Sequence, residues 1–414
     1  MVSTQQRFAP RRSTPEPGRT SSGRDRRLSA IATASLAALL LGACSGNGAQ
    51  DDSRNGGKSV EEAAARPEIS VNLQGRAAAP GKPVTVKLAR GELKDVKVTT
   101  GKGAVLGGAV SNDGRTWTSR RAAAPGTAYT VRATTADGGS TQASFATAAA
   151  DKVNKLELAP GKGSTVGIAQ PVSIVFDHPV KNRAAVERAL KVTTSNKTVG
   201  SWGWMEHYDG RSRIDWRPKD YWAAGTKVRL QAELNGIDSG AGGGWFVRDY
   251  DMDFTIGSSQ VVKVDLGSKK LTLLRNGEVV RSIPVSAGTP GGKKRSWGGT
   301  SVLMAKEGTI NMNSETVGLG DAYNKMVDYS MRLTWSGMYA HAAPWNSAHF
   351  GNANRSSGCI GMSTSNASWL YSQVRAGDPF EMSGPGHKGD PAPGNGYGEW
   401  NLSWQEWQGK SALA

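Results

Sequence analysis

The chain has 414 residues, including 53 glycines and 18 prolines, with 37% hydrophobic residues and a formal net charge of +16. This length predicts two to three domains, and the glycine and proline content favours turn-rich β structure over helical bundles. Two cysteines, Cys44 and Cys359, are too few for a disulfide framework or a four-cysteine zinc site. The sequence also lacks a Walker loop, a dinucleotide-binding glycine motif and H-E-x-x-H, which counts against nucleotide sites and metal hydrolases.

The first segment has the features of an export signal. Arginines at positions 24, 26 and 27 precede an apolar run from Leu28 to Leu41, which is too short to span a bilayer but suits a signal-peptide core. The following Gly-Ala-Cys44 resembles a bacterial lipobox, in which the signal is cut before a cysteine that is then acylated. We therefore expect a signal peptide over 1–43 and a lipidated, flexible linker over 44–65. The lipid would hold the exported protein at the outer face of the cytoplasmic membrane. Plain secretion is the alternative.

Two modules with period-two hydrophobic patterns follow. In the first, over 66–150, Val84, Val86 and Leu88 alternate with polar residues, and glycine-rich turns separate the runs. The second, over 151–258, repeats the plan and adds a short helix near 183–190. Each pattern predicts an antiparallel β-sandwich. Four tryptophans of the second module are expected in its core, with a carbohydrate-binding platform as the alternative: Trp202, Trp204, Trp216 and Trp222.

The pattern changes in the third unit, over 259–385. A strand is expected over 262–266, and Asn276-Gly277 between two apolar runs predicts a two-residue hairpin. The polar stretch 286–299 resembles a loop at the mouth of a site. Apolar residues with helical spacing predict a helix near 363–374.

Cys359 is the residue in this unit that most needs explanation. Glycines on both sides allow its backbone to turn sharply and present the thiol, with amide groups free to hold an oxyanion. A thiol attacks as its thiolate, and a neighbouring imidazole lowers its pKa. His341, 18 residues upstream, is the candidate. Taken singly, Cys359 could also be an inert buried thiol and His341 an ordinary histidine at a strand end.

Two segments together resemble a known signature. Tyr339-Ala-His-Ala-Ala-Pro-Trp345 and Ser356-Ser-Gly-Cys-Ile-Gly-Met-Ser363 are similar to the catalytic motifs of L,D-transpeptidases with a YkuD-type domain, of the multidomain kind found in actinobacteria. The segment that begins at Met312 resembles the start of the family's lid, and Tyr323 falls at the lid tyrosine. The resemblance implies a mainly β protein: two immunoglobulin-like sandwich modules, then a β-rich catalytic domain and a short C-terminal tail.

The resemblance also implies roles for individual residues. Cys359 would be the nucleophile and His341 the general base, with its ring oriented by the backbone carbonyl of Ala342. The oxyanion would be held by the Gly358 and Cys359 amides, with the Tyr323 hydroxyl as a further donor. The substrate pocket would include five residues, of which Asn354 and Ser356 would also brace the cysteine loop: Trp345, Met312, Ser356, Ser357 and Asn354.

The implied reaction is acyl transfer on peptidoglycan stem peptides. The thiolate would attack the third residue of a donor tetrapeptide, release D-alanine, and pass the acyl group to a diaminopimelate amine of an acceptor stem, giving a 3→3 cross-link. No metal or cofactor is needed for this chemistry. A carbapenem would acylate the same cysteine. Nucleic acid is not an expected partner, because the basic residues are not clustered in a binding motif.

Position 357 departs from the family pattern, because the family has a histidine where this chain has Ser357. If that histidine supports the loop by hydrogen bonding, serine replaces it in part, and the expected result is impaired turnover. If it sets the charge of the thiolate, the chain would be a non-catalytic wall-binding lipoprotein on the same scaffold. His349 would compensate only if its loop folds inward.

The tail, over 386–414, carries Trp400, Trp404 and Trp407 at helical spacing. We expect a short helix that docks these indoles onto the catalytic domain or the second module. The alternative is an aromatic surface that contacts glycan.

Overall fold

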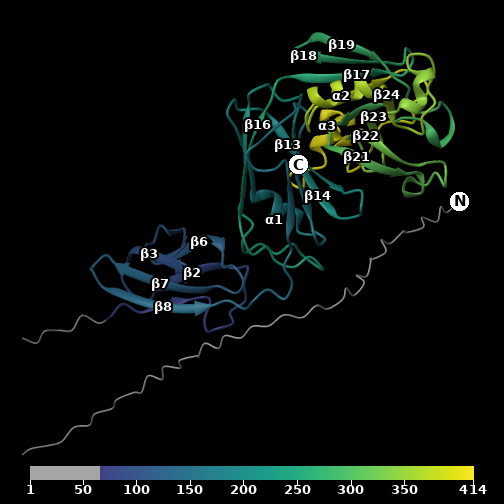
Figure 1. Ribbon diagram of the computed structural model, residues 1–414. Coiled ribbons are helices and arrows are strands. Elements are labelled where there is room, and N and C mark those ends of the chain that lie inside the picture. The colour runs from purple at the N-terminus through teal and green to yellow at the C-terminus, as the bar shows by residue number, and fades with distance from the viewer. Residues whose placement is uncertain (1–65) are drawn as a thin grey trace, which may run out of the picture. The chain divides into compact units, whose positions relative to one another are not determined.

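The computed structural model describes residues 66–414, and Figure 1 shows their mainly β architecture. The predicted signal peptide, the lipidation site at Cys44 and the linker lie outside the described residues. Within 66–414, no helix has the length and apolar character needed to cross a bilayer.

The first module is a sandwich of two four-stranded sheets, as predicted. One sheet has the order β1-β2-β6-β5 and the other β4-β3-β7-β8. The predicted alternation is confirmed, because Val84, Val86 and Leu88 all point into the core. The strands are β1 Ile69–Val71, β2 Pro83–Leu88, β3 Leu93–Thr100, β4 Val105–Leu106, β5 Gly108–Val110, β6 Thr116–Ala122, β7 Ala128–Thr135 and β8 Ser140–Ala146.

The second module is also a two-sheet sandwich, with the orders β10-β16-β15-β12 and β13-β14-β11-β9. The predicted helix is α1 (Arg183–Arg188). All four tryptophans of this module are buried in its core, which confirms the packing interpretation. The strands are β9 Leu156–Ala159, β10 Ser164–Val166, β11 Val172–Phe176, β12 Leu190–Thr194, β13 Gly200–Glu206, β14 Ser212–Pro218, β15 Lys227–Ala232 and β16 Tyr250–Ile256.

The third unit packs two sheets around one apolar core. The first has the order β19-β18-β17-β25-β20: β17 is Gln260–Asp265, β18 Lys270–Arg275, β19 Glu278–Pro284, β20 Gly299–Val302 and β25 Pro379–Ser383. The second has the order β21-β22-β23-β24: β21 is Ala305–Asn313, β22 Asn324–Arg332, β23 Tyr339–Ala342 and β24 Ile360–Met362.

Local features of the third unit confirm the sequence predictions. Asn276 and Gly277 join β18 to β19 with φ angles of 52° and 84°, which fits a two-residue hairpin turn. The predicted helix is α2 (Thr364–Gln373), which begins after Ser363 because that hydroxyl accepts a hydrogen bond from the Asn366 amide. Between β19 and β20 there is only a short 3₁₀ turn, η1 (Gly292–Lys294), so the stretch 286–299 is largely loop.

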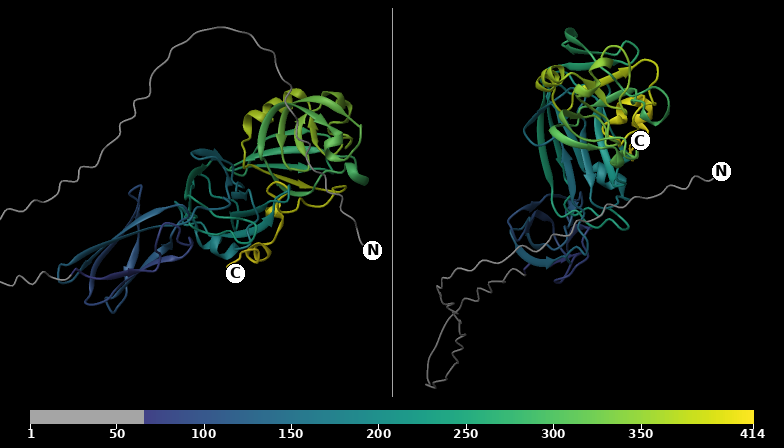
Figure 2. Two further views of the ribbon diagram at one scale, coloured as in Figure 1. Left: turned by 90° about the horizontal axis from the view of Figure 1, so that it is seen from below. Right: turned by 45° about the vertical axis from the view of Figure 1, so that its right-hand side comes forward.

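The C-terminal segment returns to the second module. It forms η4 (Gly398–Asn401) and α3 (Trp404–Gln408), and both views of Figure 2 show this yellow segment beside the teal strands. The Trp407 indole is completely buried and donates to the Ser201 carbonyl at 3.0 Å. The Arg217 guanidinium lies within 4.8–5.5 Å of the ring centres of all three predicted tryptophans. The docking prediction is therefore confirmed, but the prediction of one helix for all three tryptophans is wrong, because Trp400 lies in η4 and only Trp404 and Trp407 lie in α3.

A buried ion pair of the second module also contacts the C-terminal segment. Arg213 and Asp215 on β14 form an ion pair, and both side chains are almost completely shielded from solvent. Arg213 donates to the Gly396 carbonyl at 2.8 Å, and its guanidinium lies 5.0 Å from the Tyr397 ring centre. Because an unpaired buried charge is costly, these contacts fix the segment to the module.

Candidate active site

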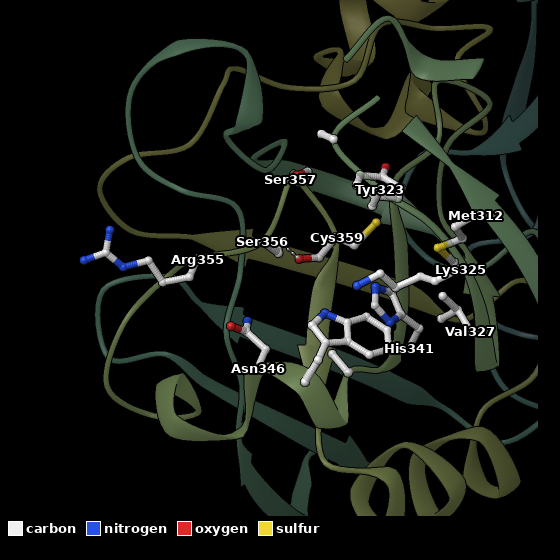
Figure 3. Close-up of a pocket in the computed structure, with 13 residues that line it drawn as sticks. Met312, Tyr323, Lys325, Val327, His341, Asn346, Arg355, Ser356, Ser357 and Cys359 are labelled. Atoms are coloured by element: carbon white, nitrogen blue, oxygen red, sulfur yellow. Dashed lines mark hydrogen bonds between the residues drawn. The ribbon is translucent and has the colours of Figure 1, made fainter. Parts of the chain in front are cut away.

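Two adjacent parallel strands bring the predicted nucleophile and base together. His341 of β23 pairs with Gly361 of β24, and Cys359 lies two residues before Gly361. Since side chains alternate along a strand, Cys359 is expected on the same face as the residue that pairs with His341. Both side chains line one cavity, and Figure 3 shows them directed into it.

The loop before Cys359 is held in the conformation that presents the thiol. Gly358 has a φ of +125°, a region that side-chain-bearing residues rarely adopt. The Ser356 hydroxyl donates to the Cys359 carbonyl at 2.6 Å and accepts from the Gly358 amide at 3.2 Å. Ser356 therefore braces the loop, as predicted. The prediction that the Gly358 amide is free for an oxyanion is wrong for this structure, because that amide already binds Ser356.

Asn354 supports the same loop from behind. Its amide nitrogen donates to the Leu266 carbonyl at 2.8 Å, and its oxygen accepts from the Ala287 amide at 3.0 Å. The bracing prediction is confirmed. Asn354 is not among the residues that line the cavity, and both ends of its amide bind the backbone, so its place in the substrate pocket stays a prediction.

His341 is fixed in one orientation by its neighbours. Its Nδ1 lies 2.7 Å from the Ala342 carbonyl, as the resemblance implied. Because that carbonyl can only accept, Nδ1 carries the proton in the neutral ring and Nε2 has the free lone pair. The ring also stacks on Trp345, with 6.0 Å between the ring centres. His341 is thus prepared to accept a proton at Nε2.

Burial keeps His341 uncharged. The side chain is 5% exposed, and its pKa is lowered to about 4. Burial is the main cause, the bond to Ala342 opposes it, and the nearby Lys325 ammonium adds to the lowering. At neutral pH the imidazole is therefore free to take a proton.

Burial also keeps the thiol protonated. Cys359 is 8% exposed, and burial raises its pKa to about 11. Its Sγ donates to the Gly337 carbonyl at 3.6 Å. The prediction that an imidazole lowers this pKa is wrong for this structure, because burial raises it and the neutral imidazole carries no charge that would stabilise a thiolate. The pair rests as thiol and neutral imidazole.

The cavity has a volume of about 200 Å³. Four of the five predicted pocket residues line it: Met312, Trp345, Ser356 and Ser357. Trp345 is 51% exposed and lies at its mouth. His349 is not among the lining residues, so compensation for Ser357 from that side chain finds no support in this structure.

Tyr323 enters the cavity from the β21–β22 hairpin. Ser314 of the intervening turn, η2 (Ser314–Val317), fixes its backbone through two 2.9 Å bonds, one to the Tyr323 amide and one to its carbonyl. Burial raises the pKa of Tyr323 to about 12, and the nearby Cys359 adds to the rise. The phenol therefore stays protonated and can donate.

Sequence reasoning missed two cationic residues of the cavity, Lys325 and Arg355. The alternation of side chains along a strand could have identified Lys325. Since side chains alternate along a strand, a tyrosine at 323 that faces the site predicts that residues 325 and 327 face it too. Tyr323, Lys325 and Val327 do all line the cavity. Arg355 lies in a loop, where no such periodicity applies.

Comparisons with known proteins agree with the domain organisation. Residues 259–382 match the family model for the L,D-transpeptidase catalytic domain, and residues 75–238 match that for a bacterial Ig domain. L,D-transpeptidase 2 of Mycobacterium tuberculosis is 33% identical over 341 residues, covering 80% of this chain and 81% of the relative. L,D-transpeptidase 5 of the same species is 32% identical, covering 81% and 74%.

A solved structure of the L,D-transpeptidase LdtMt1 in complex with imipenem is 32% identical. It covers 56% of this chain and 100% of that chain, with a TM-score of 0.48. The relatives and the matched domains define an enzyme that carries a YkuD catalytic domain behind immunoglobulin-like modules. This chain belongs to the L,D-transpeptidase family.

Proposed function

We propose that this enzyme forms 3→3 peptidoglycan cross-links through a thioester on Cys359. One observation carries the proposal: Cys359 and His341, from neighbouring parallel strands, line the same cavity. The donor is a tetrapeptide stem, and the acceptor is the neutral side-chain amine of a diaminopimelate in a neighbouring stem. The leaving group is D-alanine.

In the first step the thiol proton moves to Nε2 of His341 as Sγ bonds to the carbonyl carbon of the third stem residue. Because thiol and imidazole both start uncharged, this proton transfer accompanies the attack. The C–N bond then breaks, and the imidazolium gives its proton to the departing D-alanine amine. The products are a thioester on Cys359 and a neutral His341.

The second step reverses these roles. The acceptor amine attacks the thioester carbon and gives a proton to His341, the C–S bond breaks, and the sulfur takes that proton back. The cross-link is the new amide bond. Water would compete with the amine, so coverage of the thioester by the β21–β22 hairpin favours transfer over hydrolysis.

We assign the oxyanion of both steps to the Cys359 amide and the Tyr323 hydroxyl. The Gly358 amide is engaged by Ser356, which leaves the next amide of the turn as the backbone donor. A protonated phenol in a half-buried position supplies the second donor. Carbapenems would acylate Cys359 by the same attack, with the lactam carbonyl in place of the stem carbonyl.

A purified stem peptide tests the proposal directly. We expect the enzyme, given a disaccharide tetrapeptide, to yield a dimer whose mass is twice that of the substrate minus one D-alanine. Fragmentation by mass spectrometry places the new bond between two diaminopimelate residues. An acceptor whose side-chain amine is acetylated is the control and should give no cross-linked product. Absence of both dimer and D-alanine from the unmodified substrate would contradict the proposal.

We also propose that the enzyme acts at the outer face of the cytoplasmic membrane, anchored through Cys44. The support is the sequence of an apolar run followed by Leu41-Gly-Ala-Cys44. Growth with a labelled fatty acid should label the protein, and Cys44→Ala should remove the label. A variant that remains labelled would contradict anchoring at this residue.

A further inference from the structure

The active-site cavity is cationic. Its charged lining residues are Lys325 and Arg355, and within residues 66–414 no carboxylate lines it. Neither residue forms an ion pair with a described carboxylate. Two cations in one cavity without a counter-charge are suited to an anionic ligand.

Lys325 is the cation beside the proton donor. Its Nζ lies 4.3 Å from the centre of the Trp345 indole, and that indole stacks on the His341 ring. The ammonium is also near enough to depress the pKa of His341. Figure 3 shows the Lys325 side chain ending next to His341, whereas Arg355 extends away from both catalytic side chains.

The carboxylate of the departing amino acid is expected close to Lys325. In the proposed reaction, His341 protonates the amine of the amino acid that leaves. When the donor ends at that residue, its carboxylate is attached to the carbon that bears the amine. A cation next to His341 therefore lies where the terminal carboxylate of a tetrapeptide arrives. A donor with one more residue would have an amide there, with its carboxylate further along the chain.

We propose that Lys325 binds the C-terminal carboxylate of the donor stem and so selects donors with one residue after the scissile bond. The inference rests on the proposed function and names the residue that sets its donor specificity. The cation–π contact with Trp345 holds the ammonium in place before the donor arrives. The bond to the carboxylate is charge-assisted, so its loss is expected to cost roughly 10- to 100-fold in kcat/KM.

Two synthetic donors test the inference: a tetrapeptide stem that ends in D-alanine and the same stem that ends in D-alaninamide. The readout is kcat/KM for release of the terminal residue by the full chain at saturating acceptor. We expect the wild type to prefer the carboxylate donor roughly 10- to 100-fold. Lys325→Gln should lose that preference by slowing only the carboxylate donor, and Lys325→Arg should keep most of it.

Arg355→Gln is the matched control, because it removes the same charge from the same cavity at a distance from His341. It should keep the wild-type preference. Circular dichroism and thermal unfolding of Lys325→Gln should match those of the wild type, which verifies an intact fold.

The outcomes separate this inference from the proposed function. If the wild type turns over the carboxylate donor and Lys325→Gln keeps the full preference, the assignment of Lys325 is wrong and the function stands. Equal slowing of both donors in Lys325→Gln would also overturn it, since the lysine would then only support the fold of the site. If the wild type releases neither terminal residue, the proposed function fails, and this inference fails with it.

Discussion

Replacing Cys359 by serine is expected to abolish acylation by imipenem, with a loss on the order of 10⁴-fold or more. The cavity already raises the pKa of the thiol to about 11 through burial. The same burial acts on a serine hydroxyl, which is far less acidic, so no competent nucleophile is left. Intact-protein mass spectrometry after incubation with imipenem measures the result: an adduct of one imipenem mass on the wild type and none on the variant.

Cys44→Ala is the matched control for this experiment, because Cys44 is the other cysteine of the chain. That variant should form the adduct at the wild-type rate. An adduct that persists on Cys359→Ser and disappears from Cys44→Ala would place the nucleophile elsewhere and overturn the assignment. Circular dichroism of both variants checks that each remains folded.

His341→Gln is expected to slow acylation of Cys359 by roughly 10²- to 10⁴-fold. The glutamine amide can still donate to the Ala342 carbonyl, but it cannot take the proton of the thiol. His349→Gln is the control, since His349 lies outside the cavity lining, and it should acylate normally. A His341→Gln variant as fast as the wild type would show that the thiol is activated by another group.

The rate of Cys359 acylation in the wild type should depend on pH through the protonation of His341. The neutral imidazole is the active form, and its pKa is lowered to about 4. Acylation should therefore stay level from about pH 9 down to about pH 5 and fall only as the pH approaches 4. The acidic limb should be absent in His341→Gln. A limb near the ordinary histidine pKa of about 6.5 would contradict the buried, neutral state.

Protein stability changes over the same range and needs a parallel measurement. In the unfolded chain His341 takes up a proton near pH 6.5, whereas in the folded chain it does so near pH 4. The unfolded state therefore binds more protons between these values, and the contribution of His341 to stability declines as the pH falls through this window. Thermal unfolding at each pH separates this loss from loss of catalysis.

Much of the fold was predictable because its signals are local. Alternating apolar residues defined strands such as β2, and Asn276-Gly277 defined a hairpin by backbone preference alone. That Cys359 and His341 share one cavity was also predictable, since the two segments around them resemble the catalytic motifs of a known family.

The protonation states and hydrogen-bond partners of the site residues were not predictable, because they depend on the three-dimensional surroundings of each residue. The protonation states of Cys359 and His341 are set by burial, which neighbouring sequence does not reveal, so the expected thiolate was not found. The hydrogen bond between the Gly358 amide and the Ser356 hydroxyl depends on the backbone conformation of residues 356–359, which the sequence alone does not give. The partners of the Asn354 amide, Ala287 and Leu266, lie far away in the chain, so the resemblance implied that Asn354 braces the loop but could not give these contacts.

The return of the C-terminal segment to the second module has a consequence for biosynthesis. Trp407 packs against a module whose own strands end near residue 256, and about 150 residues, among them the whole catalytic domain, come between. Domains commonly mature from the N-terminus as the chain emerges. Because Trp407 follows the catalytic domain in the chain, this surface of the second module stays uncovered until residues 398–408 have been made. A chain halted near residue 385 would expose it, and would also lack the hydrogen bonds between Asn401 and Thr300 of β20.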